Sequence, residues 1–136
     1  MAAYADSDLT HTVIGCFYEV FRELGHGYAE KIYRRALAIV LHEHGLEALQ
    51  ETPLTVNFHG RQIGKFWVDI LVNQCLYVEV KAAADIEPYA TAQLLNYLKC
   101  VGGGVGLLVN FGNELKFRRY IVGLPPKNDT TAVEEH

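Results

Sequence analysis

Three charged residues interrupt two apolar segments of the chain. Asp69 lies within residues 67–72, and Glu79 and Lys81 lie within residues 76–81. Charged side chains are unfavourable inside strands unless they are solvated or have partners. Carboxylates bind divalent metal ions, and a neighbouring lysine can stabilise developing negative charge. The three residues together therefore indicate metal-assisted hydrolysis of a phosphodiester.

The surrounding sequence predicts the elements that position these residues. Apolar residues at helical spacing predict helices over 10–24, 28–44 and 88–101. Segments rich in β-branched and aromatic residues predict strands over 54–58, 66–72, 76–81, 106–111 and 117–122. This order predicts an α/β fold whose mixed central sheet is flanked by helices on both faces, because the third helix makes a parallel crossover and hairpins supply the antiparallel pairs.

The register of the hairpin around residues 73–75 determines whether the two carboxylates meet. A two-residue turn would place Asp69 opposite Val78 and on the wrong face. A three-residue turn pairs Asp69 with Glu79, Val68 with Val80, and Ile70 with Val78. The second register places all the apolar side chains on one face and the acids beside Lys81 on the other. Neighbouring carboxylates repel unless a cation lies between them, so we expect Mg²⁺ or Mn²⁺ there.

A simpler interpretation is a solvated face on which Glu79 and Lys81 form an ordinary surface ion pair. Polar residues on two predicted helices favour a site. Glu30 lies at the edge of an apolar helix face, where an unpaired carboxylate is costly. Gln93 and Tyr97 are one turn apart and project from the same face of the third helix. They converge on the carboxylates if both helices cover that face of the sheet.

This order of elements resembles the PD-(D/E)xK nuclease superfamily, with the Gln-x-x-x-Tyr element of RecB-type nucleases. More closely, the chain resembles the GxxExxR protein family, a bacterial group within that superfamily. The resemblance extends from the first helix to the 106–111 strand and is carried by GHGYAEKIYRRAL (25–37), VDILV (68–72), VEVKA (78–82) and QLLNYL (93–98). Val68 stands at the Pro position of the superfamily name and Tyr33 at the final Arg position of the family name, while neighbouring Arg34 is expected to point elsewhere on the helix.

The resemblance implies a restriction-endonuclease-like fold, Mg²⁺ or Mn²⁺ as cofactor, and DNA or RNA as substrate. The implied metal ligands are Asp69, Glu79, the Val80 carbonyl and Glu30, the last directly or through water. Lys81 would be the catalytic lysine, and Gln93 with Tyr97 would position the substrate or the lysine. The implied catalytic set is Asp69, Glu79, Lys81, Gln93 and Tyr97.

Length and composition bound the remaining possibilities. A chain of 136 residues, half of them apolar, predicts one domain, with residues 9–124 as an ordered core and 125–136 as a loose polar tail. No apolar run approaches the roughly 18 residues of a membrane span, and the first residues resemble no targeting signal, so we expect a soluble cytoplasmic protein. The chain has three cysteines and no C-x-x-C motif. We interpret them, Cys16, Cys75 and Cys100, as reduced core residues.

Charge leaves two classes of function open. The net charge of −4 argues against a nucleic-acid coat protein, but residues 9–124 carry 11 basic and 11 acidic residues, so a polyanionic substrate is not excluded. The sequence favours a metal-dependent nuclease. The alternative is a catalytically inactive domain that uses the same fold to bind nucleic acid or a protein. The oligomeric state stays open.

Overall fold

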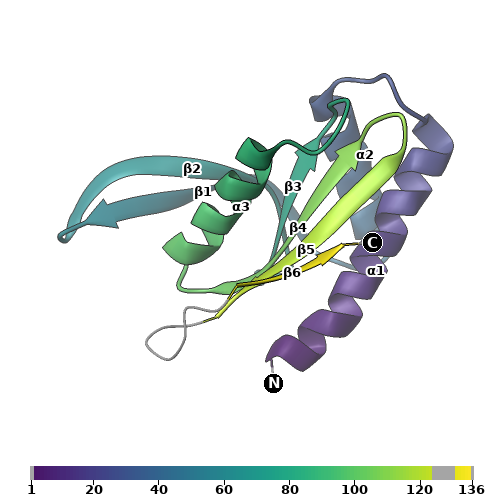
Figure 1. The fold of residues 1–136 in the computed structure, drawn as a ribbon. Coiled ribbons are helices and arrows are strands. Elements are labelled where there is room, and N and C mark those ends of the chain that lie inside the picture. The colour runs from purple at the N-terminus through teal and green to yellow at the C-terminus, as the bar shows by residue number, and fades with distance from the viewer. Residues whose placement is uncertain (1, 124–130, 136) are drawn as a thin grey trace.

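The computed structural model in Figure 1 describes residues 2–123 and 131–135. Its elements are α1 (Ala2–Leu24), α2 (Glu30–Glu43), β1 (Ala48–Phe58), β2 (Arg61–Val72), β3 (Leu76–Lys81), α3 (Pro88–Cys100), β4 (Gly104–Phe111), β5 (Leu115–Val122) and β6 (Thr131–Glu135). The sheet has the order β1-β2-β3-β4-β5-β6, with β3 and β4 parallel and the other neighbours antiparallel. Among the described helices, none combines the length and hydrophobicity needed to cross a bilayer.

The helices cover both faces of this sheet. α1 and α2 lie on one face and α3 lies on the other (Figure 1). The first face buries a cluster that includes Phe17, Tyr33, Leu37, Ile70, Val78 and Val80. The second buries Val68, Ala90, Leu94, Tyr97, Leu98, Leu108, Tyr120 and Val122. The predicted mixed sheet with helices on both faces is therefore confirmed, and it agrees with a restriction-endonuclease-like arrangement.

Several elements extend beyond their predicted bounds. β3 has the predicted range, but α1, β1 and β2 begin earlier, at Ala2, Ala48 and Arg61. β1 is an edge strand whose outward residues meet water, so its first half lacks the apolar pattern of a buried strand. Residues 131–135, where we expected a loose tail, pair with β5 and cover its edge. The rest of the expected tail, residues 125–130 and 136, lies outside the described residues.

The hairpin of β1 and β2 bends where it leaves the sheet (Figure 1). The bend lies at Glu51, which has φ of 52°, a value that is uncommon for a residue with a side chain. Ladder pairs flank the bend on both sides, Gln50 with Ile70 and Thr52 with Val68. We call the distal half of this hairpin, residues 52–68, the hairpin arm.

The bend changes which face the side chains of β2 occupy. Residues two apart in a regular strand share a face, yet Ile70 packs with α1 and α2 whereas Val68 packs with α3. The predicted pairing of Ile70 with Val78 is confirmed, but the β2–β3 ladder reaches no further than this pair. The expectation that Val68 pairs with Val80 on one apolar face is therefore wrong, because the two strands diverge at Asp69.

The cysteines differ in environment. Cys16 is buried in α1, as predicted, whereas Cys75 in the β2–β3 turn and Cys100 at the end of α3 are exposed. The interpretation as core residues is thus wrong for Cys75 and Cys100. A turn and a helix terminus both place side chains at the surface, and the small apolar character of a cysteine does not reveal this.

Candidate active site

Asp69 and Glu79 lie together where β2 and β3 diverge. The backbone N–H of Val80 donates to Asp69 Oδ2 at 2.7 Å, so the carboxylate takes the position of a ladder carbonyl. The backbone of Asp69 also faces the Glu79 carboxylate and lowers its pKa. The structure therefore brings the two acids side by side, as the sequence predicts, although Asp69 bonds to Val80 through its side chain and forms no regular ladder pair with Glu79.

Glu79 is buried to an unusual degree for a carboxylate. It is 3 % exposed, and its Oε1 has no hydrogen-bond partner among the described residues. Burial, and then the charge of Asp69, raise the Glu79 pKa from 4.5 to about 8. Burial also raises the pKa of Asp69, against the lowering effects of the Val80 hydrogen bond and the charge of Lys81. Both shifts mean that this position disfavours uncompensated negative charge.

Lys81 holds its ammonium group beside these acids. Lys81 Nζ lies 3.7 Å from Glu79 Oε2 and 3.5 Å from Gln93 Oε1, so β3 and α3 together position it. The side chain of Lys81 is 23 % exposed, so it is only partly buried. Gln93 thus lies beside the lysine, although α2 and α3 cover opposite faces of the sheet and not one shared face, as the predicted convergence required.

Tyr97 reaches the site from the same helix but contacts the bend of β2. Its hydroxyl donates to the Trp67 carbonyl at 3.3 Å, and its ring packs against Phe66 with centroids 5.0 Å apart. Burial, followed by the charges of Glu79 and Asp69, raises the pKa of Tyr97, so the hydroxyl stays protonated. Tyr97 therefore fixes the strand that carries Asp69.

Two residues of α2 reach the site from the other side of the sheet. Glu30 is exposed in the first turn, and its charge raises the pKa of both Asp69 and Glu79. Arg34, one turn later, lowers the pKa of Asp69. It also donates from Nε to Gln50 Oε1 at 3.2 Å and lies 3.9 Å from Glu51, so it ties α2 to the bend.

Arg34 points in a different direction from Tyr33, as expected, and this direction brings it to the bend beside Asp69. Residues four apart share a helix face, so the spacing from Glu30 is the signal that could have found it. Tyr33 has a structural role. It is buried, its hydroxyl donates to the Gly25 carbonyl, and its ring stacks on Phe111 with centroids 4.5 Å apart.

Asn110 is a further residue that sequence reasoning missed. It is 1 % exposed in β4 and makes two hydrogen bonds with the backbone of Ala83, accepting from its N–H at 2.9 Å and donating to its carbonyl at 3.0 Å. Ala83 follows Lys81 by two residues, so Asn110 holds the chain in place just beyond the site. An asparagine inside an otherwise apolar strand is the sequence signal for such a role.

The donor set suits a hard divalent cation. The described residues contain no group of three or more His, Cys, Asp or Glu side chains arranged around a common point. Mg²⁺ needs fewer, because it retains several waters and binds through one or two carboxylates. Glu79 Oε1 is buried beside Asp69 and has no hydrogen-bond partner within residues 2–123 and 131–135, and this is the observation that fits such an ion.

A family model of the PD-(D/E)XK nuclease superfamily matches residues 7–120. The chain belongs to this superfamily. No curated protein and no solved structure matched the chain. The part of the chain that matches the PD-(D/E)XK model includes α2, β2, β3 and α3, the elements that carry every residue of the candidate site.

Proposed function

We propose that the protein is a Mg²⁺- or Mn²⁺-dependent nuclease that hydrolyses phosphodiester bonds of DNA or RNA. The observation that carries this proposal is the buried Glu79 carboxylate, whose Oε1 has no hydrogen-bond partner among the described residues and which lies beside Asp69 and Lys81. Leaving a buried charge uncompensated is costly, and a bound cation would remove that cost. Membership of the superfamily supports the same chemistry.

Each site residue has a distinct role in this proposal. Asp69, Glu79 and the Val80 carbonyl would hold the ion, with Glu30 contributing through water. When bound, the ion lowers the pKa of water and offsets charge on the phosphodiester. Lys81 presents its ammonium group to the reacting phosphate, where it stabilises negative charge.

Gln93 and Tyr97 act through their neighbours. The 3.5 Å contact from Gln93 Oε1 orients the Lys81 ammonium, which leaves hydrogen-bonding capacity for the substrate. The hydroxyl of Tyr97 holds the Trp67 carbonyl and so maintains the separation of β2 from β3. We also propose that the chain is a GxxExxR-type protein, on the basis of Gly27 and Glu30, with the buried Tyr33 replacing the arginine.

The proposal is tested by incubating the protein with labelled single-stranded and duplex DNA and RNA in Mg²⁺, Mn²⁺ or Ca²⁺. Lys81→Ala is compared with Lys99→Ala, which removes an exposed lysine at the far end of α3. We expect cleavage by the wild type and Lys99→Ala, and a loss of at least about 100-fold in Lys81→Ala. Absence of cleavage on every substrate would favour the inactive binding domain, and equal cleavage by Lys81→Ala would indicate a contaminant.

A further inference from the structure

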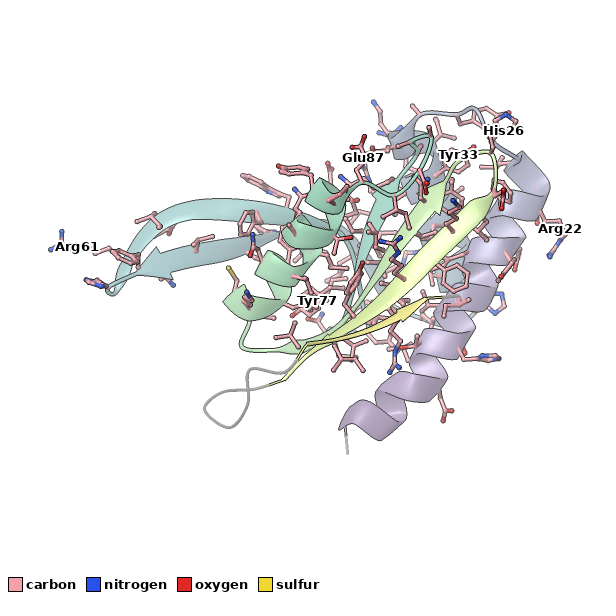
Figure 2. All side chains as sticks on the ribbon, viewed as in Figure 1. Arg22, His26, Tyr33, Arg61, Tyr77 and Glu87 are labelled. Carbon is pink, nitrogen blue, oxygen red and sulfur yellow. The ribbon has the colours of Figure 1, made fainter. Side chains whose placement is uncertain are left out.

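The hairpin arm differs in charge from the rest of the chain. Its residues, 52–68, include Arg61 and Lys65 but no Asp or Glu, whereas the whole chain has a net charge of −4. Figure 2 shows Arg61 at the tip of the arm, pointing away from the body of the protein. An acid-free, cationic projection on an acidic protein is complementary to a polyanion.

The arm also exposes large aromatic and apolar side chains. Trp67 is 56 % exposed and Phe58 is 60 % exposed. Strand alternation places Trp67 and Lys65 on the same face. Leu54 and Phe66 lie on the opposite face and pack against the buried residues between α3 and the sheet. The outer face of the arm therefore combines a flat aromatic ring and a cation that the packing of the domain does not use.

The arm ends beside the candidate active site. Trp67 precedes Asp69 by two residues, and its carbonyl is held by Tyr97 of the site. From Arg61 to Trp67 the strand spans about 20 Å, at about 3.3 Å per residue. That length corresponds to about six stacked nucleotides of one strand. A nucleic-acid strand lying along the arm would thus continue toward the two carboxylates.

We propose that the hairpin arm binds a single strand of DNA or RNA, with unpaired bases stacked on Trp67 and phosphates paired with Arg61 and Lys65. This inference rests on the proposed nuclease function and names its substrate as an unpaired strand or a single-stranded end. Stacking on an exposed aromatic ring requires bases that are not already paired, and cations beside the ring contact the backbone. A protein partner could also bind the exposed apolar side chains of the arm, but such binding would not explain why the arm has no Asp or Glu.

Trp67 gives a direct readout because it is the only tryptophan in the chain. The full chain is titrated in EDTA, which suppresses metal-dependent cleavage, with labelled 12-residue oligonucleotides of single-stranded DNA, single-stranded RNA and duplex DNA. We expect saturable quenching of the Trp67 fluorescence by the single strands, and binding at least about tenfold weaker for the duplex. Quenching by either single strand supports the proposal, and the comparison of DNA with RNA identifies the polymer.

Variants separate the arm from other surfaces. Fluorescence anisotropy should show about tenfold weaker binding by Trp67→Ala, with most of the affinity kept by Trp67→Phe. Arg61→Ala combined with Lys65→Ala should reduce the slope of log affinity against log salt by about 1.4, since each phosphate contact contributes about 0.7 for single strands. Arg22→Ala is the matched control, because Figure 2 shows Arg22 on α1, far from the arm, and it should leave binding unchanged.

The experiments distinguish failure of the proposal that the arm binds a single strand from failure of the nuclease proposal. Binding without a change in Trp67 fluorescence, or equal loss in Arg22→Ala, would overturn the role of the arm. Lys81-dependent cleavage that is unaffected by Trp67→Ala would also overturn it while leaving the nuclease standing. A dimer that dissociates in Trp67→Ala, measured by sedimentation, would show that the arm binds a second chain instead. Quenching of Trp67 fluorescence by single strands, with no cleavage of any substrate in the metal-containing assay, would support binding by the arm and contradict the nuclease proposal.

Discussion

Glu79→Gln tests whether burial of this carboxylate shapes the stability of the metal-free protein. The Glu79 pKa is raised from 4.5 to about 8 by burial and by Asp69. A raised pKa means that the folded state binds more protons than the unfolded state between these two values. The contribution to stability is therefore fully present below about pH 4.5, is lost as the pH rises, and reaches its minimum above about pH 8.

The size of the effect follows from the same two values. Each pH unit within the window changes the free energy of unfolding by about 1.4 kcal/mol, so the loss across it is up to about 5 kcal/mol. Glutamine keeps the shape of the side chain but cannot ionise. Glu79→Gln should therefore be more stable than the wild type at pH 8, and this difference should shrink steadily toward pH 5.

The assay is urea unfolding in EDTA at four pH values from 5 to 8.5, compared with Glu23→Gln, a matched change at an exposed position of α1. Glu23→Gln should follow the pH profile of the wild type. Parallel profiles for the wild type and Glu79→Gln would refute the reasoning, because they would show that Glu79 ionises equally easily in the folded and unfolded states.

Three further predictions concern positions around the site and in the core. Asn110→Ala leaves the N–H and carbonyl of Ala83 without their side-chain partner, so urea unfolding should show a loss of about 2–3 kcal/mol. Gly112→Ala would place its Cβ 2.6 Å from the Ala83 carbonyl oxygen, and the required backbone shift should lower stability by about 1–3 kcal/mol. For Asn110→Ala or Gly112→Ala, an unchanged unfolding midpoint would contradict the packing described. Burial and then Glu19 raise the Cys16 pKa to about 11, so iodoacetamide at pH 8 should modify Cys16 far more slowly than Cys100, and equal rates by mass spectrometry would contradict its burial.

The central hairpin could be predicted from sequence because apolar alternation determines its register. Ile70 and Val78 both belong on a buried face, and one turn length satisfies that requirement, so the pairing and the proximity of Asp69 and Glu79 followed. The positions of Gln93 and Tyr97 followed from helical spacing once α3 was predicted to cover the sheet. These features depend on strong local periodicity.

The bend of β2 could not be predicted in the same way. It depends on Glu51 adopting φ of 52° and on the side chain of Asp69 accepting a hydrogen bond from Val80. Neither a glutamate nor an aspartate in a strand predicts a bend. The alternation rule fails there, and Val68 consequently faces α3. β6 was missed for a related reason, since this short edge strand is defined by its backbone pairing with β5 and is too short to carry a clear apolar pattern.

The central claim is that Asp69 and Glu79 form a site for a divalent cation, and thermal unfolding with increasing Mg²⁺ or Mn²⁺ at pH 8 tests it most directly. A ligand that binds only the folded state stabilises it by about 2.7 kcal/mol at 100 times its dissociation constant. We predict a saturable rise in Tm for the wild type and for Asp85→Ala, which removes an exposed aspartate, and no rise for Asp69→Ala. An unchanged Tm for the wild type up to millimolar metal, or an equal rise in Asp69→Ala, would contradict the claim.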